Sequence, residues 1–203
     1  MLNEIKKLFS EREPKILGEY EKSAVIIFLI EEKGKLYILF EVRALNLNHQ
    51  PGDISLPGGR IEPKENPMDA AIRESIEELN VEREDIEVLG SMDYFVSPYN
   101  TIIYPFICKL NRKEIKPNKD EVNHVFKVPL DYFMKNDPIG YEVKIMPDFP
   151  ENFPYHLIIG GKSYKFRTGK MEQYFYQYNG YVIWGFTALI IKSFVEILKQ
   201  ITK

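Results

Sequence analysis

The sequence has too few cysteines and histidines to build a disulfide framework or a zinc centre. Cys108 is the only cysteine among the 203 residues, which excludes an intrachain disulfide and a zinc site with several thiolate ligands. The three histidines, His49, His124 and His156, lie far apart and show no metal-ligand spacing. Neither residue type therefore predicts a metal site.

An excess of positive charge and a long apolar run are also missing. The formal net charge is -3, which argues against a broad basic surface that binds nucleic acid. An anionic substrate would therefore need metal ions or a local basic pocket. The longest largely apolar run, residues 181–191, is too short to span a bilayer, and no secretory signal or peroxisomal address is recognised. We expect a cytoplasmic protein that binds neither nucleic acid nor membranes.

The composition and the order of the predicted elements indicate one layered domain. Apolar residues make up 44% of the chain and charged residues 28%, as in ordinary globular proteins. Helices are predicted at residues 1–13, 67–79, 131–135 and 184–201, and strands at residues 24–30, 36–42, 86–94, 102–110 and 124–129. Residues 136–179 are expected to form short strands and a large loop. This order predicts a single α/β domain over residues 1–203, with a mixed sheet.

The helix over residues 67–79 has well-specified ends. Asn66 can cap its amino end, and Pro67 suits the first helical position. Asn80 stands where a left-handed residue is expected after the last turn, a conformation that asparagine tolerates. We therefore expect the helix to begin and end at these residues.

Three glutamates of this helix are predicted to gather on one face. Glu74, Glu77 and Glu78 have the spacing i, i+3 and i+4, and Ala70 and Ala71 share their face. The opposite face is predicted to pack on the sheet through Met68, Ile72, Ile76 and Leu79. Neighbouring like charges repel by roughly 0.2–0.5 kcal/mol per pair, and a hard cation such as Mg²⁺ would relieve this. A solvated acidic face without a metal is the alternative.

The wider pattern around these glutamates is far more specific. Gly59, then five residues and Glu65, then seven residues and Arg73-Glu74, then two residues and Glu77-Glu78, resembles the Nudix box. Ser75 and Asn80 depart from it, where a hydrophobic residue and a glycine are usual. The resemblance implies a Nudix-like α/β/α sandwich and a hydrolase that acts on phosphoanhydride bonds.

The resemblance also implies roles for single residues. Glu74 and Glu78 would be the leading ligands of Mg²⁺ or Mn²⁺, with Glu77 and Glu65 assisting. Glu77 or Glu121 would serve as general base, and Arg73 can pair with Glu77 one turn later. Gly58 and Gly59 would let the backbone approach the site. Arg43 is a candidate phosphate contact, although a structural salt bridge is an alternative.

The segment before the box is similar to the signature of the coenzyme A pyrophosphatase branch. Arg43-Ala44, Gly52 and Pro57-Gly58-Gly59 match it in register, whereas Asn48 replaces an arginine and Leu56 a phenylalanine. Residues 120–130 and 183–188 also resemble that branch. The resemblance implies cleavage of the diphosphate in coenzyme A or acyl-coenzyme A, which gives adenosine 3′,5′-bisphosphate and (acyl-)phosphopantetheine.

Two other functions remain open from the sequence. A Nudix hydrolase acting on ADP-ribose or a nucleoside triphosphate would keep the mechanism and change the pocket. A non-catalytic Nudix-like binding module is the second alternative, although the intact glutamates argue against it. The aromatic residues between Tyr164 and Tyr178 are expected in the core or in a homodimer interface rather than around a ligand, and Trp184 is expected in the core.

Overall fold

Two long strands form the centre of the fold. The computed structural model describes residues 1–112 and 114–201. Strands β1 (Glu21–Glu32) and β2 (Lys35–Arg43) are antiparallel and form a hairpin. The turn between them contains Lys33 and Gly34, both with positive φ, 50° and 74°. The predicted hairpin and its Lys33-Gly34 turn are therefore confirmed.

Six further strands extend this hairpin into a mixed sheet. They are β3 (Ile54–Ser55), β4 (Gly58–Arg60), β5 (Ile86–Ser91), β6 (Phe95–Val96), β7 (Thr101–Leu110) and β8 (Val122–Pro129). The order is β3-β2-β1-β7-β5, and β4, β6 and β8 pair with β1, β7 and β2 respectively. Strands β1 and β7 are parallel, whereas the other pairs are antiparallel. A mixed sheet was predicted and is confirmed.

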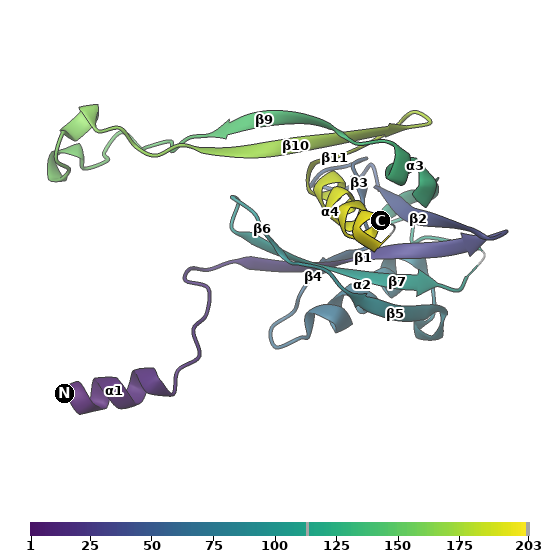
Figure 1. The fold of residues 1–203 in the computed structure, drawn as a ribbon, viewed down its shortest axis with the longest axis horizontal. Helices are drawn as coiled ribbons and strands as arrows, with labels where there is room; N and C mark the ends of the chain where they lie inside the picture. Colours follow the sequence, from purple (N-terminus) through teal and green to yellow (C-terminus); the bar gives the residue numbers. More distant parts are fainter. Residues whose placement is uncertain (113, 202–203) are drawn as a thin grey trace.

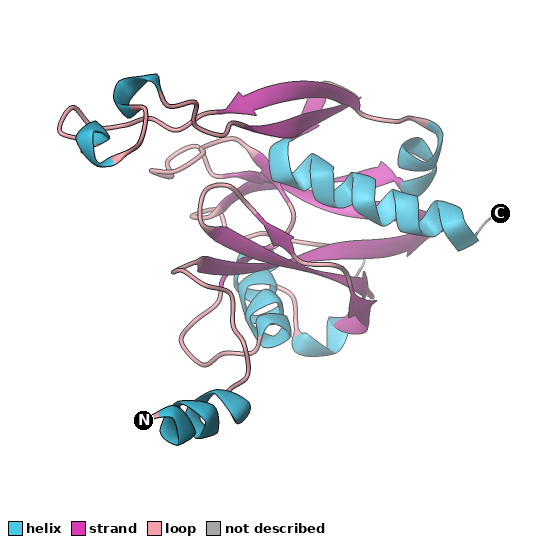
Figure 2. Cartoon of the chain, turned by 60° about the vertical axis from the view of Figure 1, so that its left-hand side comes forward, coloured by secondary structure: helices cyan, strands magenta, loops and turns pink. Residues whose placement is uncertain are grey.

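Helices cover both faces of this sheet (Figures 1 and 2). Helix α2 (Pro67–Leu79) packs on one face, over a core that includes Ala24, Ile26 and Phe28 of β1. Helices α3 (Leu130–Lys135) and α4 (Gly185–Ile201) pack on the other face, where Ile27 of β1 points. Because alternate residues of a strand point to opposite faces, one apolar strand supplies both cores. The predicted α/β/α sandwich is confirmed.

A second sheet lies over α4 and projects from the body as an arm (Figure 1). It contains β9 (Ile139–Ile145), β10 (Gly169–Tyr178) and β11 (Tyr181–Trp184) in the order β11-β10-β9. The strands are longer than the short strands expected between residues 136 and 179. The loop at the tip contains two 3₁₀ turns, Tyr155–Leu157 and Gly161–Ser163. The large loop is therefore confirmed only for residues 146–168.

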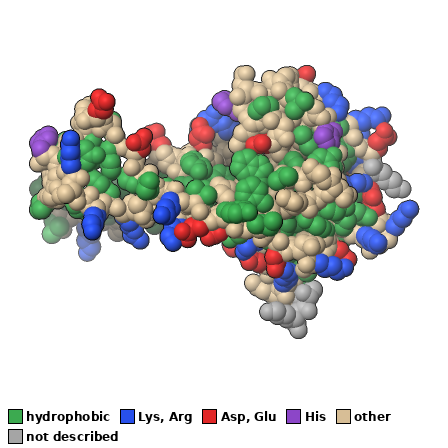
Figure 3. All heavy atoms as spheres, turned by 90° about the horizontal axis from the view of Figure 1, so that it is seen from above, with side chains coloured by type: hydrophobic (Ala, Val, Ile, Leu, Met, Phe, Trp, Pro, Cys, Tyr) green, Lys and Arg blue, Asp and Glu red, His purple; other side chains and the backbone are tan. Residues whose placement is uncertain are grey.

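The two faces of this second sheet have different environments. Tyr176 and Ile183 are buried in the core beneath it. Trp184 closes β11 with 43% of its surface exposed, so its expected place in the core and within the last helix is wrong. Helix α4 instead begins at Gly185, whose φ of 66° turns the chain. Figure 3 looks down on this sheet and shows apolar side chains gathered on its outer face.

The amino-terminal helix stands apart from the body (Figure 1). Helix α1 covers Leu2–Ser10, within the predicted range of residues 1–13, and none of its residues is buried. Within the described residues, no helix combines the length and the apolar character needed to cross a membrane.

Candidate active site

The β3–β4 segment brings glycines beside helix α2. Strands β1 and β2 pair directly at residues 29–32 and 35–38. Beyond these residues β4 pairs with β1, and β3 pairs with β2. The segment from Ile54 to Arg60 thus lies between two diverging strands. It leads into α2, where the box glutamates lie.

Gly58 and Gly59 both lie so close to neighbouring atoms that a Cβ atom at either position would overlap with them. Gly58 has a φ of 134°, and a Cβ there would lie 2.2 Å from the carbonyl oxygen of Ala24. A Cβ on Gly59 would lie 2.6 Å from the carboxylate carbon of Glu74. The backbone N–H of Gly58 donates to Oε2 of Glu78 at 2.8 Å. Two glycines therefore let the backbone contact two of the box carboxylates.

Helix α2 begins and ends as its sequence predicts. The side chain of Asn66 accepts a hydrogen bond from the N–H of Met68, and Pro67 occupies the first turn. Asn80 is left-handed, with φ 51° and ψ 48°. Its side-chain amide also donates to the carbonyl of Lys116 at 2.9 Å, which fastens the helix end to a distant loop.

The predicted apolar face of α2 packs on the sheet, because Ile72 and Leu79 are buried and Met68 and Ile76 pack against the same core. The opposite face, however, is not simply an exposed acidic surface. Glu78 is buried at 7% exposure, and Ala70, Ala71 and Ser75 are fully buried. The helix also lies close to β4, where Gly58 binds Glu78 and Gly59 lies against Glu74. The hydroxyl of Ser75 donates to the carbonyl of Ala71 at 2.7 Å, which explains why serine fits a position usually hydrophobic. Met68 and Ile76 are only half-buried.

Arg73 holds several parts of the box together. Its Nε and Nη2 donate to the two carboxylate oxygens of Glu65, at 2.9 and 3.1 Å. Its Nη1 donates to Oε1 of Glu74 at 2.8 Å, and its Nη2 also reaches the carbonyl of Arg60. The predicted pairing with Glu77 is present but is the longest of these ion pairs, at 3.7 Å. The hydrogen bonds from Arg73 lower the pKa of Glu65, whose oxygens are both engaged.

A buried glutamate outside the box adjoins this site and was missed from the sequence. Glu41 of β2 is 1% exposed. The hydroxyl of Ser55 donates to its Oε1 at 2.8 Å, while its buried Oε2 has no hydrogen-bond partner among the described residues. Burial raises the pKa of Glu41 to about 7. A charged residue within an otherwise apolar predicted strand was the signal available in the sequence.

The carboxylates of the site repel one another. Burial, followed by the charge of Glu41, raises the pKa of Glu78 well above its ordinary value. Burial also raises the pKa of Glu74, even though Arg73 opposes this. The charge of Glu121, an exposed residue just before β8, adds to the rise at all three glutamates. The charges of carboxylates on β2, on α2 and in the loop before β8 therefore act on one another.

This arrangement fits a divalent cation. In the part of the chain that the structure describes, no three His, Cys, Asp or Glu side chains already surround a single point. Mg²⁺ does not need such a cage, because it keeps several waters and takes only one or two carboxylates. The buried Oε2 of Glu41, which has no hydrogen-bond partner among the described residues, is an oxygen that could bind such a cation. The donors are oxygens, which Mg²⁺ and Mn²⁺ prefer.

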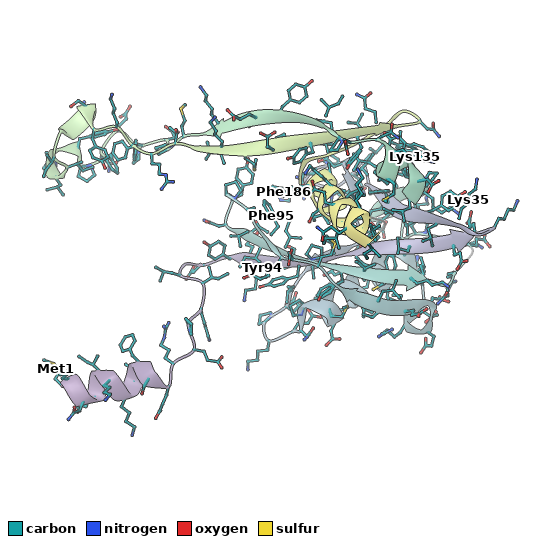
Figure 4. All side chains as sticks on the ribbon, in the orientation of Figure 1. Met1, Lys35, Tyr94, Phe95, Lys135 and Phe186 are labelled. Carbon is teal, nitrogen blue, oxygen red and sulfur yellow. The ribbon has the colours of Figure 1, made fainter. Side chains whose placement is uncertain are left out.

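A pocket of about 320 Å³ is lined in part by Ser55, whose hydroxyl binds Glu41. Arg43 and Ser55 line it on the side of the sheet, and Tyr99 and Phe186 line it on the other side. Phe186 also packs on Phe95, with ring centroids 5.0 Å apart (Figure 4). Nη2 of Arg43 donates to the carbonyl of His49 at 3.3 Å, while its buried Nε has no partner among the described residues. The pocket thus offers a cation and aromatic surfaces.

A larger hollow of about 970 Å³ lies on the other side of the box loop. Arg60, Lys64 and Glu65 line it together with the segment from Glu19 to Lys22. Among the box glutamates, only Glu65 reaches this hollow, and Arg73 already holds both of its oxygens. The smaller pocket is the better candidate because Ser55 connects it directly to Glu41.

Comparison with known proteins identifies the family. A model described as the NUDIX domain matches residues 20–149 of the 203. Peroxisomal coenzyme A diphosphatase NUDT7 of Mus musculus is 36% identical over 115 residues, which cover 56% of this chain and 49% of that protein. Mitochondrial coenzyme A diphosphatase NUDT8 of Homo sapiens is 24% identical over 181 residues, or 87% of this chain and 69% of that protein.

A solved structure supports the same fold. The MutT/nudix family protein from Enterococcus faecalis matches with a TM-score of 0.51 at 16% identity, over 98% of this chain and 70% of that chain. The present chain spans about half the length of the mouse relative, at 49%. Because the domain match covers well over half of the sequence, the chain belongs to the NUDIX domain family.

Proposed function

We propose that the protein is a metal-dependent pyrophosphatase that cleaves the diphosphate linkage of coenzyme A or acyl-coenzyme A. The observation that carries the proposal is the contact of Glu74 and Glu78 with the Gly58-Gly59 backbone, in the same segment as Ser55, which lines the pocket of Arg43. The names of the mouse and human relatives, both coenzyme A diphosphatases, support this substrate class. The products would be adenosine 3′,5′-bisphosphate and (acyl-)phosphopantetheine.

Glu74 and Glu78 are proposed to hold Mg²⁺ or Mn²⁺, with Glu77 assisting. The metal would polarise a phosphoryl oxygen and lower the pKa of a bound water. Glu65 is proposed to act through Arg73 rather than as a ligand, because the guanidinium binds both of its oxygens. Arg73 in turn fixes Oε1 of Glu74 and so positions that carboxylate.

Glu121 is proposed as the general base. Its charge contributes to the raised pKa of Glu41, Glu74 and Glu78, which supports this role. Glu77 is the alternative, although its carboxylate lies toward Arg73. The base would accept a proton as the water oxygen bonds to phosphorus. The bridging oxygen would then leave with the other phosphate.

Arg43 is proposed to bind the substrate from the adjoining pocket. A guanidinium binds phosphate oxygens bidentately, and the buried Nε of Arg43 is one donor without a partner among the described residues. Tyr99 and Phe186 line the same pocket and would pack against the less polar parts of the substrate. This pocket would place the diphosphate toward the carboxylates, because Ser55 lies between the two.

The test is product analysis with a matched variant. Wild-type protein and Glu78→Gln are incubated with coenzyme A and Mg²⁺, and the products are identified by mass spectrometry. We expect adenosine 3′,5′-bisphosphate and phosphopantetheine from the wild type. Glu78→Gln keeps the shape of the side chain and loses its charge, so turnover should fall by about a hundredfold or more. Intact coenzyme A with the wild type, or near-wild-type turnover by the variant, would contradict the proposal.

ADP-ribose is a second candidate substrate for one specific reason. Asn48 stands where the resembling signature has an arginine, which removes a cation that could bind the 3′-phosphate of coenzyme A. The same metal chemistry would then act on a diphosphate without that phosphate. A non-catalytic nucleotide-binding module, the remaining alternative, would bind metal and nucleotide without releasing products.

We also propose that two copies pair through the outer face of the second sheet. Five apolar residues of this face are at least 41% exposed: Ile139, Tyr141, Val143, Val182 and Trp184. Strand β9 pairs only with β10 among the described residues, which leaves its other edge unpaired. An exposed strand edge is a template for pairing, and a twofold axis would let one β9 pair with another.

A further inference from the structure

We propose that Glu41, a residue of strand β2 outside the box, is a further ligand of the divalent cation. The cation would then be held from the sheet as well as from helix α2. This inference rests on the metal-dependent activity proposed above. It adds a ligand that comes from a different element and that the box pattern does not contain.

The burial of Glu41 calls for a partner that the described residues do not supply. Its side chain is 1% exposed, within a strand whose neighbouring residues Leu39 and Phe40 are fully buried. A buried carboxylate is costly unless it is paired or coordinates a metal. Ser55 donates to Oε1, and Oε2 has no hydrogen-bond partner among residues 1–112 and 114–201. Within this part of the chain, one oxygen of Glu41 is therefore fixed and the other is unpaired.

Glu41 faces the proposed metal site rather than the opposite core. Residues of a strand alternate between faces, and Leu39 belongs to the core under helix α2. Glu41 therefore points to the same side as α2. The charge of Glu41 acts directly on Glu78, for which it is the largest cause of the shifted pKa after burial. Both carboxylates bind the β3–β4 segment, Glu41 at Ser55 and Glu78 at Gly58.

Each of these two carboxylates is oriented by one hydrogen bond. Ser55 of β3 holds Oε1 of Glu41, and the backbone N–H of Gly58 in β4 holds Oε2 of Glu78. Both donors come from the short segment that separates β1 from β2. This segment would therefore set the distance between two ligands, and the remaining coordination positions of Mg²⁺ would be filled by Glu74, water or phosphate oxygens.

The arginine at the end of the same strand does not replace a metal. Arg43 lies two residues beyond Glu41, and its charge opposes the rise in the pKa of Glu41. Its guanidinium, however, donates to the carbonyl of His49, and no hydrogen bond or ion pair joins it to Glu41 within the described residues. Arg43 remains available to a phosphate, and Oε2 of Glu41 remains available to a cation.

The most direct experiment uses the wild-type protein. Crystals are soaked in MnCl₂, and manganese is located from its anomalous scattering. We expect a peak at coordination distance from Oε2 of Glu41 and from Glu78. A peak that contacts Glu74 and Glu78 but not Glu41 would overturn this inference and leave the proposed function standing. Failure of the protein to bind Mn²⁺ in crystals and in solution would overturn both.

A solution experiment measures affinity without substrate. The Kd for Mn²⁺ is determined by calorimetry for the wild type, for Glu41→Gln and for Glu87→Gln, a control on the exposed part of strand β5. Residues that merely support metal ligands contribute about tenfold to a hundredfold to affinity, so loss of a ligand should weaken binding at least tenfold. The control should bind as the wild type does.

A purely structural role for Glu41 would give a different result. The melting temperature of metal-free Glu41→Gln would then fall while the Kd for Mn²⁺ stayed within about twofold of the wild type, which would overturn the inference. Circular dichroism establishes that each variant is folded. If Glu41→Gln does not fold, Glu41→Asp is measured in its place. Aspartate keeps the negative charge on a side chain that is shorter by one methylene group, so it should still weaken Mn²⁺ binding. An unchanged Kd for that folded variant would equally contradict the proposal.

Discussion

At the scale of single residues, alanine substitutions of two adjacent glycines should have different effects, one on stability and the other on activity. A methyl group at Gly58 would overlap the backbone of β1, at 2.2 Å from Ala24, on a φ of 134°. Gly58→Ala should therefore destabilise the fold by at least about 3 kcal/mol. A methyl group at Gly59 would meet only the end of the Glu74 side chain, which can move. Gly59→Ala should keep stability within about 1 kcal/mol and lower kcat.

Urea unfolding and steady-state kinetics on both glycine variants check this contrast. Gly59→Ala should melt like the wild type but turn over more slowly, because the displaced carboxylate of Glu74 no longer occupies its position beside the backbone. Equal loss of stability in the two variants would show that Gly59 serves packing rather than the site.

Glu41 should make the stability of the metal-free protein depend on pH. Its pKa is raised from 4.5 to about 7, so the folded state binds a proton more tightly than the unfolded state does. The contribution of protonated Glu41 to the free energy of unfolding is fully present below pH 4.5. This contribution, up to about 3 kcal/mol, is lost as the pH rises through about 7. Glu78 is shifted in the same direction.

The measurement is urea unfolding with a chelator at about pH 5 and about pH 8. Stability of the wild type should fall between the two, and Glu41→Gln should fall clearly less because it has no proton to lose. Identical pH dependence in the two proteins would contradict the buried, ionisable state of Glu41.

At the scale of elements, the end of α2 gives a test of backbone conformation. Asn80 is left-handed, and its side chain also binds the carbonyl of Lys116. Asn80→Gly relieves the backbone but loses that hydrogen bond, so stability should change by less than about 1 kcal/mol. Asn80→Val loses the bond and places a β-branched residue at positive φ, which should cost about 2 kcal/mol or more. Thermal melts that rank Val with Gly would contradict the assignment.

The sequence predicts both ends of the box helix and its apolar face, but not the burial of Ser75 and Glu78. Capping depends on local residues, so Asn66, Pro67 and Asn80 are sufficient to place both ends. The burial of Glu78 depends on a distant segment, because its carboxylate accepts from the backbone N–H of Gly58. Apolar periodicity assigns Ser75 and Glu78 to the solvent side. The spacing pattern still identifies the glutamates, because it does not depend on which side of the helix packs.

For Glu41, the sequence indicates that the side chain is buried but not which residues surround it. Its place in an apolar strand indicates burial, but its neighbours are fixed by the pairing of β2 with β3 and by the closeness of α2. These contacts join residues that are far apart in the sequence. The second sheet was also hard to predict, because aromatic residues on both faces of β10 conceal the alternation of a strand.

At the scale of the whole molecule, the outer face of the second sheet predicts self-association. Tyr141 is 60% exposed at the centre of edge strand β9. Tyr141→Lys should therefore dissociate the pair, since edge strands with lysine resist pairing. Sedimentation velocity is the measurement, and Lys165→Glu in the tip loop is a surface control that should not change the assembly. A wild type that sediments as a monomer at all concentrations would refute the pairing.

Substrate preference tests the central claim most directly. The kcat/KM values for coenzyme A, dephospho-coenzyme A and ADP-ribose are compared under one metal condition. We expect clear cleavage of coenzyme A, because Ser55 binds Glu41 and also lines the pocket that contains Arg43 and the aromatic side chains. Dephospho-coenzyme A should be discriminated only weakly, because Asn48 removes a cation for the 3′-phosphate. A clear preference for ADP-ribose over coenzyme A would contradict the proposed substrate class.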